Sequence, residues 1–284
     1  MNTSLLKFSP GAFLAPAVDW LNTNLHPLFS AISTIVETVL SAIEAVLLIL
    51  PPPAMIAIVV VAAFFAVNLR GAVLAGLCLG FCLIVGFWTA SMQTVALVTV
   101  AVFISVLIAF PVGVLCARYR ALEAAVRPVL DVMQTVPPWV YLIPAVMVFS
   151  LGRVPAIIAT IVYGIPPMLR LTTLAFKQIP REYIELGSAI GAHPRSVLWK
   201  IEIPLAKQTL LVGLNQCILL SLAMVVLAGL VGAGGLGAEV TRGLTRMEMG
   251  LGLRAGLAIV AVALLLDRLS RGLLDRNRAS AAPK

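Results

Sequence analysis

MQTVALVTVAVFISVLIAFPVGVLCA, residues 92–117, is the stretch that decides the fold of this chain. It contains no charged side chain, and it exceeds the ~20 apolar residues that an α-helix needs to cross the hydrocarbon core of a bilayer. The stretch therefore predicts a transmembrane helix.

The whole chain has the composition of a membrane protein. Of its 284 residues, 61% are hydrophobic and 11% are charged, and the mean hydropathy is +1.07. Charged residues alone make about a quarter of a typical soluble domain, so a soluble fold is excluded. We expect an all-α, polytopic transmembrane helical bundle of about seven spans. The apolar runs are 54–69, 72–89, 92–117, 131–151, 154–176, 207–231 and 251–269.

One of these runs contains three prolines. Pro137, Pro138 and Pro144 all lie within 131–151. A proline inside a helix removes a backbone hydrogen bond, and freed backbone groups are tolerated at membrane depth where they line a cavity or contact other helices. We therefore expect a broken helix that lines a cavity.

Residues 28–50 alternate apolar and polar side chains at the helical period, which predicts an amphipathic helix along the membrane interface. The alternative is a true span, which would bury Glu37 and Glu44 at considerable cost. Residues 1–27 hold one lysine and no apolar core, so we expect no cleavable signal. The expected division is an external segment 1–53, a transmembrane domain 54–272 that includes a cytoplasmic loop 177–206, and a short basic tail 273–284.

The basic residues predict the orientation. With the amino terminus outside and seven spans, 15 of the 20 lysines and arginines fall on the inner side. Cytoplasmic loops of membrane proteins carry such an excess, so the loop 177–206 and the carboxyl terminus are expected in the cytoplasm. The net charge of +8 follows from this topology and does not indicate nucleic-acid binding. The outer side keeps Lys7, Arg153, Arg242, Arg246 and Arg254.

The loop reads Glu185-Leu186-Gly187, three residues, Gly191, nine residues, then Ile201-Glu202-Ile203-Pro204. Pro180 suits the first turn of a short helix, Gly191 suits the left-handed conformation that ends it, and His193-Pro194 suits a restart as a second short helix. The sequence thus predicts helix, tight turn, helix.

Three apolar side chains, Tyr183, Leu186 and Ile190, recur at helical spacing in the first of these helices. Such a ridge fits a groove on a soluble partner. An amphipathic loop lying on the membrane surface is the alternative, and periodicity does not decide between them. Charged residues around the ridge are Arg181, Arg195 and Lys200.

Several other signals indicate packing. Gly232-Ala233-Gly234-Gly235-Leu236-Gly237 fits a dinucleotide fingerprint but follows a membrane span without a βαβ unit, so we interpret it as a packed turn. No phosphate-binding Gly-x-x-x-x-Gly-Lys-Ser/Thr loop exists, so ATP hydrolysis by that route is not expected of this chain. His26 and His193 are too isolated to make a catalytic pair, and no metal site is expected. The cysteines, interpreted as buried core residues, are Cys78, Cys82, Cys116 and Cys217.

The predicted spans contain almost no ionisable side chains, which disfavours coupling to protons or sodium ions. A weakly polar, aromatic translocation path would suit a cation that is shielded by methyl groups. Core packing is the alternative for each residue of this path. The candidates are Met133, Gln134, Trp139, Tyr141, Asn215, Gln216 and Met224.

The loop resembles the cytoplasmic coupling loop of importer permeases of the ATP-binding-cassette (ABC) class. Their pattern is Glu-Ala-Ala, any three, Gly, any nine, Ile, any one, Leu, Pro. Every spacing matches, and Leu186, Gly187 and Ile203 differ in residue type. The resemblance implies that a partner ATPase is contacted by this loop, with candidate residues Tyr183, Glu185, Leu186, Gly187, Ile190, Gly191, Ile201 and Pro204.

From about Val95 to Arg271 the chain resembles the permease subunit of glycine betaine, proline betaine and choline importers. The blocks that carry this resemblance are Leu130-Asp131-Val132-Met133-Gln134-Thr135-Val136-Pro137, Gly164-Ile165-Pro166-Pro167-Met168-Leu169-Arg170-Leu171-Thr172, Gly213-Leu214-Asn215-Gln216, Met224-Val225-Val226, Gly234-Gly235-Leu236-Gly237 and Leu266-Asp267-Arg268.

The resemblance implies a type I ABC importer permease fold in a bacterial inner membrane, with alternating access. Its implied partners are a second copy of this chain, a cytoplasmic ATPase that binds ATP and magnesium, and an extracytoplasmic substrate-binding protein. No cofactor of this chain itself is implied. Two alternatives stay open: an importer of the same architecture for methionine, phosphonate or another small nutrient, and a membrane scaffold or ion-coupled carrier without an ATPase. Among betaine, choline, carnitine and proline the sequence does not decide.

Overall fold

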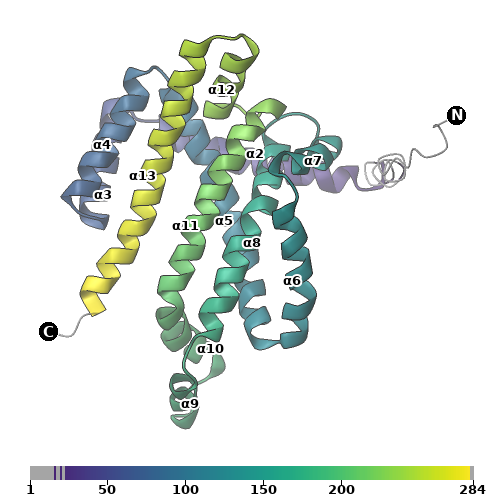
Figure 1. The fold of residues 1–284 in the computed structure, drawn as a ribbon, viewed down its shortest axis with the longest axis vertical. Helices are drawn as coiled ribbons and strands as arrows, with labels where there is room; N and C mark the ends of the chain where they lie inside the picture. The colour runs from purple at the N-terminus through teal and green to yellow at the C-terminus, as the bar shows by residue number, and fades with distance from the viewer. Residues whose placement is uncertain (1–15, 17–19, 21–22, 282–284) are drawn as a thin grey trace, which may run out of the picture.

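The structure is a computed structural model that describes residues 16, 20 and 23–281, with the backbone alone for residues 273–281. The described residues form helices and connecting turns, and no strand occurs among them, so the predicted all-α class is confirmed. Lys7, most of the segment 1–27 and the side chains of the basic tail 273–284 fall outside the described part. The helices form an elongated bundle (Figure 1).

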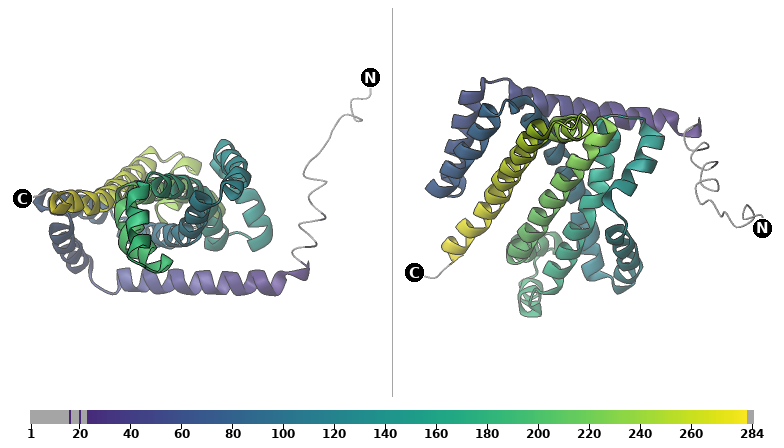
Figure 2. Two further views of the ribbon diagram at one scale, coloured as in Figure 1. Left: turned by 90° about the horizontal axis from the view of Figure 1, so that it is seen from below. Right: turned by 45° about the horizontal axis from the view of Figure 1, so that its top comes forward.

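The first described helix, α2 (His26–Leu48), lies crosswise to the long helices at one end of the bundle (Figure 2). Its apolar side packs on the core through the buried Leu40 and the half-buried Val36 and Ile43. By length and hydropathy α2 would also be able to span a membrane. Its crosswise direction agrees with the predicted interfacial helix.

Helices α3 (Pro52–Ala66) and α4 (Leu69–Ile84) form a hairpin that packs against the last helix. Asn68 makes the turn, because its side-chain oxygen accepts a hydrogen bond from the Gly71 N–H at 2.9 Å. The predicted run 72–89 is wrong at its carboxyl end, since α4 stops at Ile84. Gly86 follows with a φ of +83°, which is the left-handed conformation.

The predicted count of seven spans is not established by the structure. Helices α3 and α4 have 15 and 16 residues, fewer than the ~20 that cross hydrocarbon. Within the described residues, five helices are long and apolar enough to span, or six when one broken pair is counted.

The centre of the bundle consists of α5 (Trp88–Arg118), α8 (Arg153–Lys177) and α11 (Ile203–Ala228), with α13 (Met249–Ala281) beside them. Small residues bring the first three together at Gly164. A Cβ added there would lie 3.1 Å from Cys217 Sγ and from Ser221 Oγ, and 3.2 Å from Ser105 Oγ. Small residues at such a crossing let membrane helices approach closely.

The proline-rich run is broken, as predicted. Helix α6 (Arg120–Thr135) is followed by the 3₁₀ turn η2 (Pro138–Tyr141) and by α7 (Leu142–Phe149), with a bend of 108° between the two arms. The predicted start at 131 is wrong, because α6 already begins at Arg120. Apolar-run counting misses its first turns, which carry charged side chains.

The glycine-rich segment forms a packed turn, as predicted. It joins the short 3₁₀ turn η4 (Gly229–Val231) to α12 (Gly235–Thr245). The Gly235 N–H donates to Gln93 Oε1 at 3.1 Å, and the Leu236 N–H donates to Thr94 Oγ1 at 2.9 Å. Two side chains of α5 thereby satisfy two of the free N–H groups at the start of α12.

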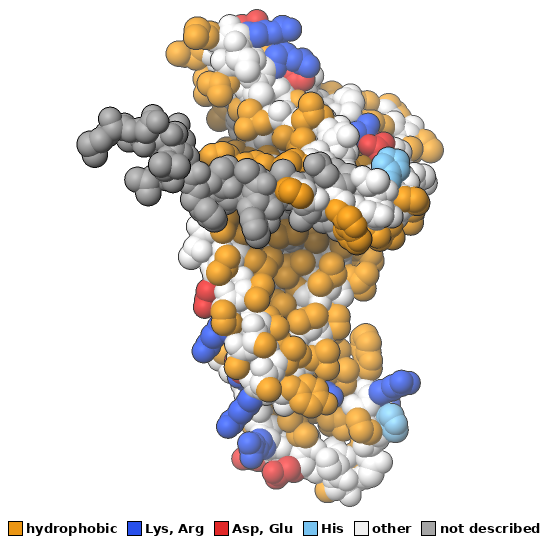
Figure 3. Space-filling view, turned by 90° about the vertical axis from the view of Figure 1, so that its right-hand side faces the viewer, with side chains coloured by type: hydrophobic (Ala, Val, Ile, Leu, Met, Phe, Trp, Pro, Cys, Tyr) orange, Lys and Arg blue, Asp and Glu red, His pale blue; other side chains and the backbone are white. Residues whose placement is uncertain are grey.

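Apolar side chains cover the middle of the face shown in Figure 3, and charged side chains gather toward both ends. This is the distribution expected of a bundle that crosses a membrane. The four cysteines are buried and free, in agreement with their interpretation as core residues. In the part of the chain that the structure describes, no three His, Cys, Asp or Glu side chains gather in a geometry that could hold a metal.

Candidate functional site

The loop between α8 and α11 projects from one end of the bundle, opposite the end at which α12 lies (Figure 1). We call these the loop end and the α12 end. The first helix of the loop is α9 (Arg181–Ala189). Pro180 is the extended residue before this helix, with a φ of −60° and a ψ of 134°, so it does not occupy the first turn as expected. Glu182 lies in that turn, where a negative charge favours the helix dipole.

Gly191 ends α9 in the predicted left-handed conformation, with a φ of +70°. The Ala192 N–H donates to the Gly187 carbonyl at 3.0 Å, and the Gly191 N–H donates to the Ser188 carbonyl at 3.0 Å. This pair of bonds is a Schellman motif, which satisfies the last carbonyls of the helix. The predicted helix and tight turn are therefore confirmed.

The chain restarts as a helix at His193-Pro194, as predicted, but this second helix continues into α11 instead of ending as a short element. His193 starts α10 (Pro194–Val197) by accepting the Arg195 N–H on Nδ1 at 3.3 Å, and the helix continues through the π-turn η3 (Leu198–Glu202) into α11. One helical path thus runs from Pro194 to Val231, and the predicted span start at 207 is wrong. Pro204 gives the physical reason: it has no N–H for the carbonyl four residues earlier, and the wider turn accommodates it.

The inner side of α9 is attached to the bundle by close packing. A Cβ on Gly187 would lie 3.1 Å from Val197 Cγ2 and 3.1 Å from Ile201 Cδ1. This contact explains why position 187 requires a very small residue. Ile184 packs on a buried cluster that joins α5, α8 and α11, namely Val114, Ala175, Phe176, Ile179 and Ala206.

The outer side of α9 presents the predicted ridge to the surroundings. Tyr183, Leu186 and Ile190 are 46%, 60% and 73% exposed. Glu185 beside them is exposed, as are Gly191, Pro204 and the basic residues Arg181, Arg195 and Lys200. Of the eight candidate loop residues, Gly187 and Ile201 thus serve internal packing, and the others face outward.

Two residues of the loop region were missed by the sequence reasoning. Trp199 is largely exposed and adds an aromatic side chain at the loop end. Glu202 is buried, and its Oε2 lies 2.9 Å from Arg118 Nη2 at the end of α5. A charged residue between the apolar Ile201 and Ile203 was the available signal.

The candidate path residues fall in different places. The Tyr141 hydroxyl donates to the Met133 carbonyl at 2.7 Å, and Tyr141 packs on the same buried cluster as Met224. Tyr163, which the sequence reasoning missed, lies beside Tyr141 with ring centroids 6.4 Å apart. Three further candidates have exposed side chains, namely Gln134, Trp139 and Gln216.

Asn215 lies apart from the other candidates, in the contact between α11 and α13. Its Nδ2 donates to Asp267 Oδ1 at 3.1 Å, and its Oδ1 accepts the Ser270 hydroxyl at 2.6 Å. Both polar atoms of this buried side chain are therefore engaged in joining two helices.

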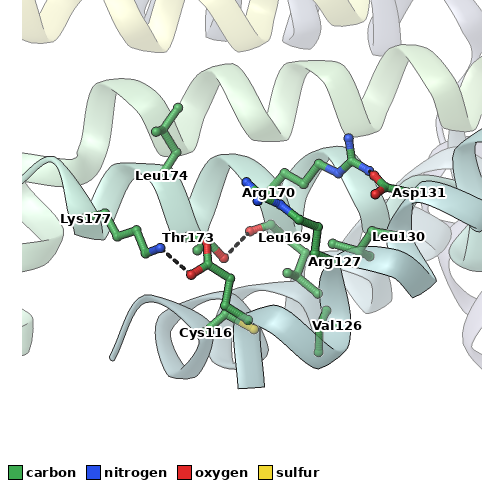
Figure 4. Close-up of a pocket in the computed structure, with 11 residues that line it drawn as sticks. Cys116, Val126, Arg127, Leu130, Asp131, Leu169, Arg170, Thr173, Leu174 and Lys177 are labelled. Carbon is green, nitrogen blue, oxygen red and sulfur yellow. Dashed lines mark hydrogen bonds and ion pairs between the residues drawn. The ribbon is translucent and has the colours of Figure 1, made fainter. Parts of the chain in front are cut away.

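A cavity of about 400 Å³ lies between α6 and α8 at the loop end (Figure 4). Ion pairs join the two helices across it, from Lys177 to Glu123 and from Arg170 to Asp131. Arg127 extends from α6 into the space between these pairs (Figure 4). The four side chains in these two ion pairs each keep at least a quarter of their surface exposed. Exposed pairs add little to the free energy of folding, so these pairs mainly fix the position of α6 relative to α8.

A family model described as "Binding-protein-dependent transport system inner membrane component" matches residues 109–278, which include the broken helix, the loop and α12. The chain belongs to this family. It is therefore a multi-pass inner-membrane permease, a transport component. The alternative of a scaffold or ion-coupled carrier is set aside, because this family works with binding proteins.

The permease is similar along most of its length to known transport subunits. It is 37% identical over 271 residues to the glycine betaine/proline betaine transport system permease protein ProW of Escherichia coli (strain K12), with 94% of this chain and 76% of the relative covered. It is 38% identical over 264 residues to the glycine betaine transport system permease protein OpuAB of Bacillus subtilis (strain 168), with 92% and 93% covered. These matches confirm the resemblance inferred from the sequence blocks.

A solved structure shows the same fold. The permease superposes on a chain of the inward-facing MetNI methionine ABC transporter with a TM-score of 0.58 and 23% identity, covering 69% of this chain and 96% of that chain. The predicted ABC importer permease fold is thus confirmed, and at this identity the likeness concerns the fold alone.

Proposed function

We propose that this permease forms the translocation path of an ATP-driven importer for quaternary ammonium compounds, glycine betaine, choline or both. ATP hydrolysis takes place on a partner subunit that holds ATP and magnesium. A separate extracytoplasmic protein delivers the substrate. The names of the two relatives support the substrate class, and the exposed ridge on α9 is the observation that supports coupling to an ATPase.

The ridge suits a protein groove because it is apolar, exposed and firmly based. Tyr183, Leu186 and Ile190 project from a helix whose other side is packed on Val197 and Ile201. A force applied to the ridge would therefore move the loop as one piece together with α10 and α11. Anchored aromatic and aliphatic side chains of this kind carry most of the energy of a typical protein interface.

The orientation and assembly belong to the same proposal. The loop end faces the cytoplasm, where an ATPase has access to α9, and the α12 end with α2 faces outward. Two copies of the permease enclose the path between them, and the exposed Gln134, Trp139 and Gln216 lie on surfaces that a second copy is able to cover. Weakly polar and aromatic side chains suit a methylated cation, since an aromatic face attracts such a cation by about 0.5–2 kcal/mol.

A competing substrate class exists within the same architecture. The MetNI structure belongs to a methionine transporter by its title, and its fold is the same. A permease of this fold therefore serves different nutrients, and the substrate choice rests largely with the binding protein. Uptake of radiolabelled glycine betaine and choline, each with the other as unlabelled competitor, tests the proposed class in cells that express the permease with its neighbouring ATPase and binding protein. Uptake of neither, with an intact complex and ATP present, would move the substrate to another nutrient class.

Docking of the ATPase is tested separately. Leu186→Glu places a charge in the centre of the ridge, and Glu185→Lys reverses a charge beside it. The matched control is Leu244→Glu, because Leu244 is 74% exposed at the α12 end. Copurification of the ATPase with the permease is expected to be lost in the two loop variants and kept in the control. Equal recovery with all three variants would refute the role of the ridge.

A further inference from the structure

Helix α5 makes polar contacts near both of its ends, with Glu202 at the loop end and with the first residues of α12 at the other. It has 31 residues, a length of roughly 45 Å at 1.5 Å per residue, and it remains one helix across Pro111. Its last residue contacts the candidate coupling loop, and its first turns contact the turn before α12. This double attachment is the basis of the inference.

The attachment at the loop end is an ion pair with a buried acid. Arg118 Nη2 lies 2.9 Å from Glu202 Oε2, and these residues are 84 positions apart in the chain. Glu202 is only 7% exposed, and it is the single charged residue that is buried among those whose side chains the structure describes. Arg118 keeps 45% of its side-chain surface exposed, so the cost of separating the pair falls on Glu202, whose buried charge would lose its partner.

Apolar contacts stiffen the same end. Val114 of α5 lies in the buried cluster with Phe176 of α8 and Ala206 of α11, and Ile184 of α9 packs on it. The ring of Phe110 meets Phe176 edge-on with centroids 6.0 Å apart. Glu202 itself ends the π-turn that continues directly into α11. Both polar and apolar contacts thus join α5 to the loop region and to the start of α11.

The attachment at the α12 end consists of two hydrogen bonds to backbone. Gln93 Oε1 and Thr94 Oγ1 accept the N–H groups of Gly235 and Leu236 at 3.1 and 2.9 Å. A Cβ on Gly235, whose φ is +64°, would lie 2.6 Å from Thr94 Oγ1 and 3.3 Å from the Thr94 backbone nitrogen, so the turn packs closely on α5 there. The turn is therefore not free to move without α5.

We propose that α5 is the strut that transmits movement of the coupling loop to the turn Gly232–Gly235 at the opposite end of the permease, with Arg118–Glu202 and Gln93/Thr94 as its two joints. This inference rests on the proposed coupling to an ATPase. Arg118 and Glu202 are positioning residues: neither is required for the ATPase to bind. The coupling-loop pattern leaves position 202 open, so the pattern alone does not identify this joint.

The test uses the complete importer reconstituted in vesicles, and it measures substrate transported per ATP hydrolysed. Glu202→Gln and Arg118→Gln are expected to keep the ATPase bound and hydrolysing, while transport per ATP falls about fivefold or more, the lower range of typical coupling between sites. The conservative Arg118→Lys is expected to restore most of the ratio. The matched control is Arg120→Gln, because Arg120 is an exposed arginine at the same end and forms no ion pair within the described residues.

The decisive comparison combines this change with one at the other end of α5. Thr94→Val removes the hydroxyl that accepts the Leu236 N–H and keeps the shape of the side chain. The free-energy effects of two distant, independent mutations normally add, so their fold-changes in transport per ATP would multiply. If α5 is the strut, Thr94→Val combined with Glu202→Gln is expected to lower the ratio no further than the stronger single variant.

Three results would overturn the proposal or its premise in distinguishable ways. Multiplying effects of the two joints would exclude transmission through α5. Normal transport per ATP in Glu202→Gln and Arg118→Gln would also exclude it. Failure of the unmodified permease to bind the ATPase would instead reject the proposed function on which the inference rests. Thermal unfolding of each variant identifies loss of transport that comes from loss of the fold.

Discussion

Arg153 Nη1 lies 3.0 Å from Glu44 Oε1, and this ion pair fastens the crosswise helix α2 to the first residue of α8. Both side chains are mostly shielded, with 34% and 13% of their surfaces exposed. The sequence reasoning had placed Arg153 on the outer side and Glu44 in the interfacial helix. Their contact shows that both residues lie at the same end of the permease.

The first prediction concerns the placement of α2. Single cysteines at Ser30, Thr38 and Ala45, which lie near the start, middle and end of α2 and are all exposed, are introduced after the native cysteines are removed. An interfacial helix is expected to react with a membrane-impermeant maleimide at similar rates at all three positions, because its length runs along the water boundary. Protection of Thr38→Cys alone would mean that α2 spans the bilayer.

The second prediction concerns the turn that ends α9. Gly191→Ala is expected to destabilise the loop by about 1–2 kcal/mol, because the left-handed conformation crowds a Cβ against the backbone. Gly191→Asn should cost less, since asparagine adopts this conformation more readily. No atom beyond the adjoining backbone lies within 4 Å of a Cβ at this position, so local backbone strain is the cause. Copurification of the ATPase is the measurement, and equal recovery with both variants would contradict the role of the turn.

The third prediction separates the two readings of Asn215. Asn215→Ala removes two hydrogen bonds in the contact of α11 with α13, at a cost of about 0.5–1.5 kcal/mol for each. Ser270 and Asp267 keep their bonds to the Asp267 carbonyl and to Arg271. We expect a lower unfolding temperature of the purified permease and an unchanged order of competition among betaine, choline and carnitine. The control is Gln216→Ala at the exposed neighbouring position, which should leave the unfolding temperature unchanged. A changed order of competition in Asn215→Ala would place this residue on the path.

The fourth prediction concerns the cysteines. Replacement of Cys78, Cys82, Cys116 and Cys217 together by serine or alanine is expected to leave transport detectable, because all four are buried and free. Complete loss of transport in a stable, well-inserted variant would restore a cysteine-based function. Cys217 should tolerate serine best, since Ser221 and Ser105 already lie beside it around Gly164.

Residues close in sequence were predicted well. The end of α9 at Gly191 depends on the left-handed preference of one glycine, and the break after α6 depends on neighbouring prolines. Both are local backbone effects, so they are visible in a short stretch of sequence. The same reasoning placed the start of the next span at 207, too late, because the π-turn that accommodates Pro204 depends on the hydrogen-bond pattern of the whole segment from Pro194 onward.

Span bounds were predicted less well, for a physical reason. Counting apolar residues treats lipid-facing and protein-facing positions alike, so it extended the run 72–89 past Ile84, where α4 ends. It also overlooked the first turns of α6, where charged side chains meet α8 across a cavity. Which face of a helix contacts another helix depends on its neighbours and is not contained in its own composition.

The sequence by itself determined an all-α membrane bundle with a broken helix after α6 and a glycine-ended helix between α8 and α11, because hydropathy, proline and glycine act within one or two helical turns. Only the tertiary structure decided that Glu202 meets Arg118, that Asn215 joins α11 to α13, and that Gln93 and Thr94 hold α12. These contacts join residues 52 to 142 positions apart. A buried polar group must find a partner, but only the packing of the helices selects which one.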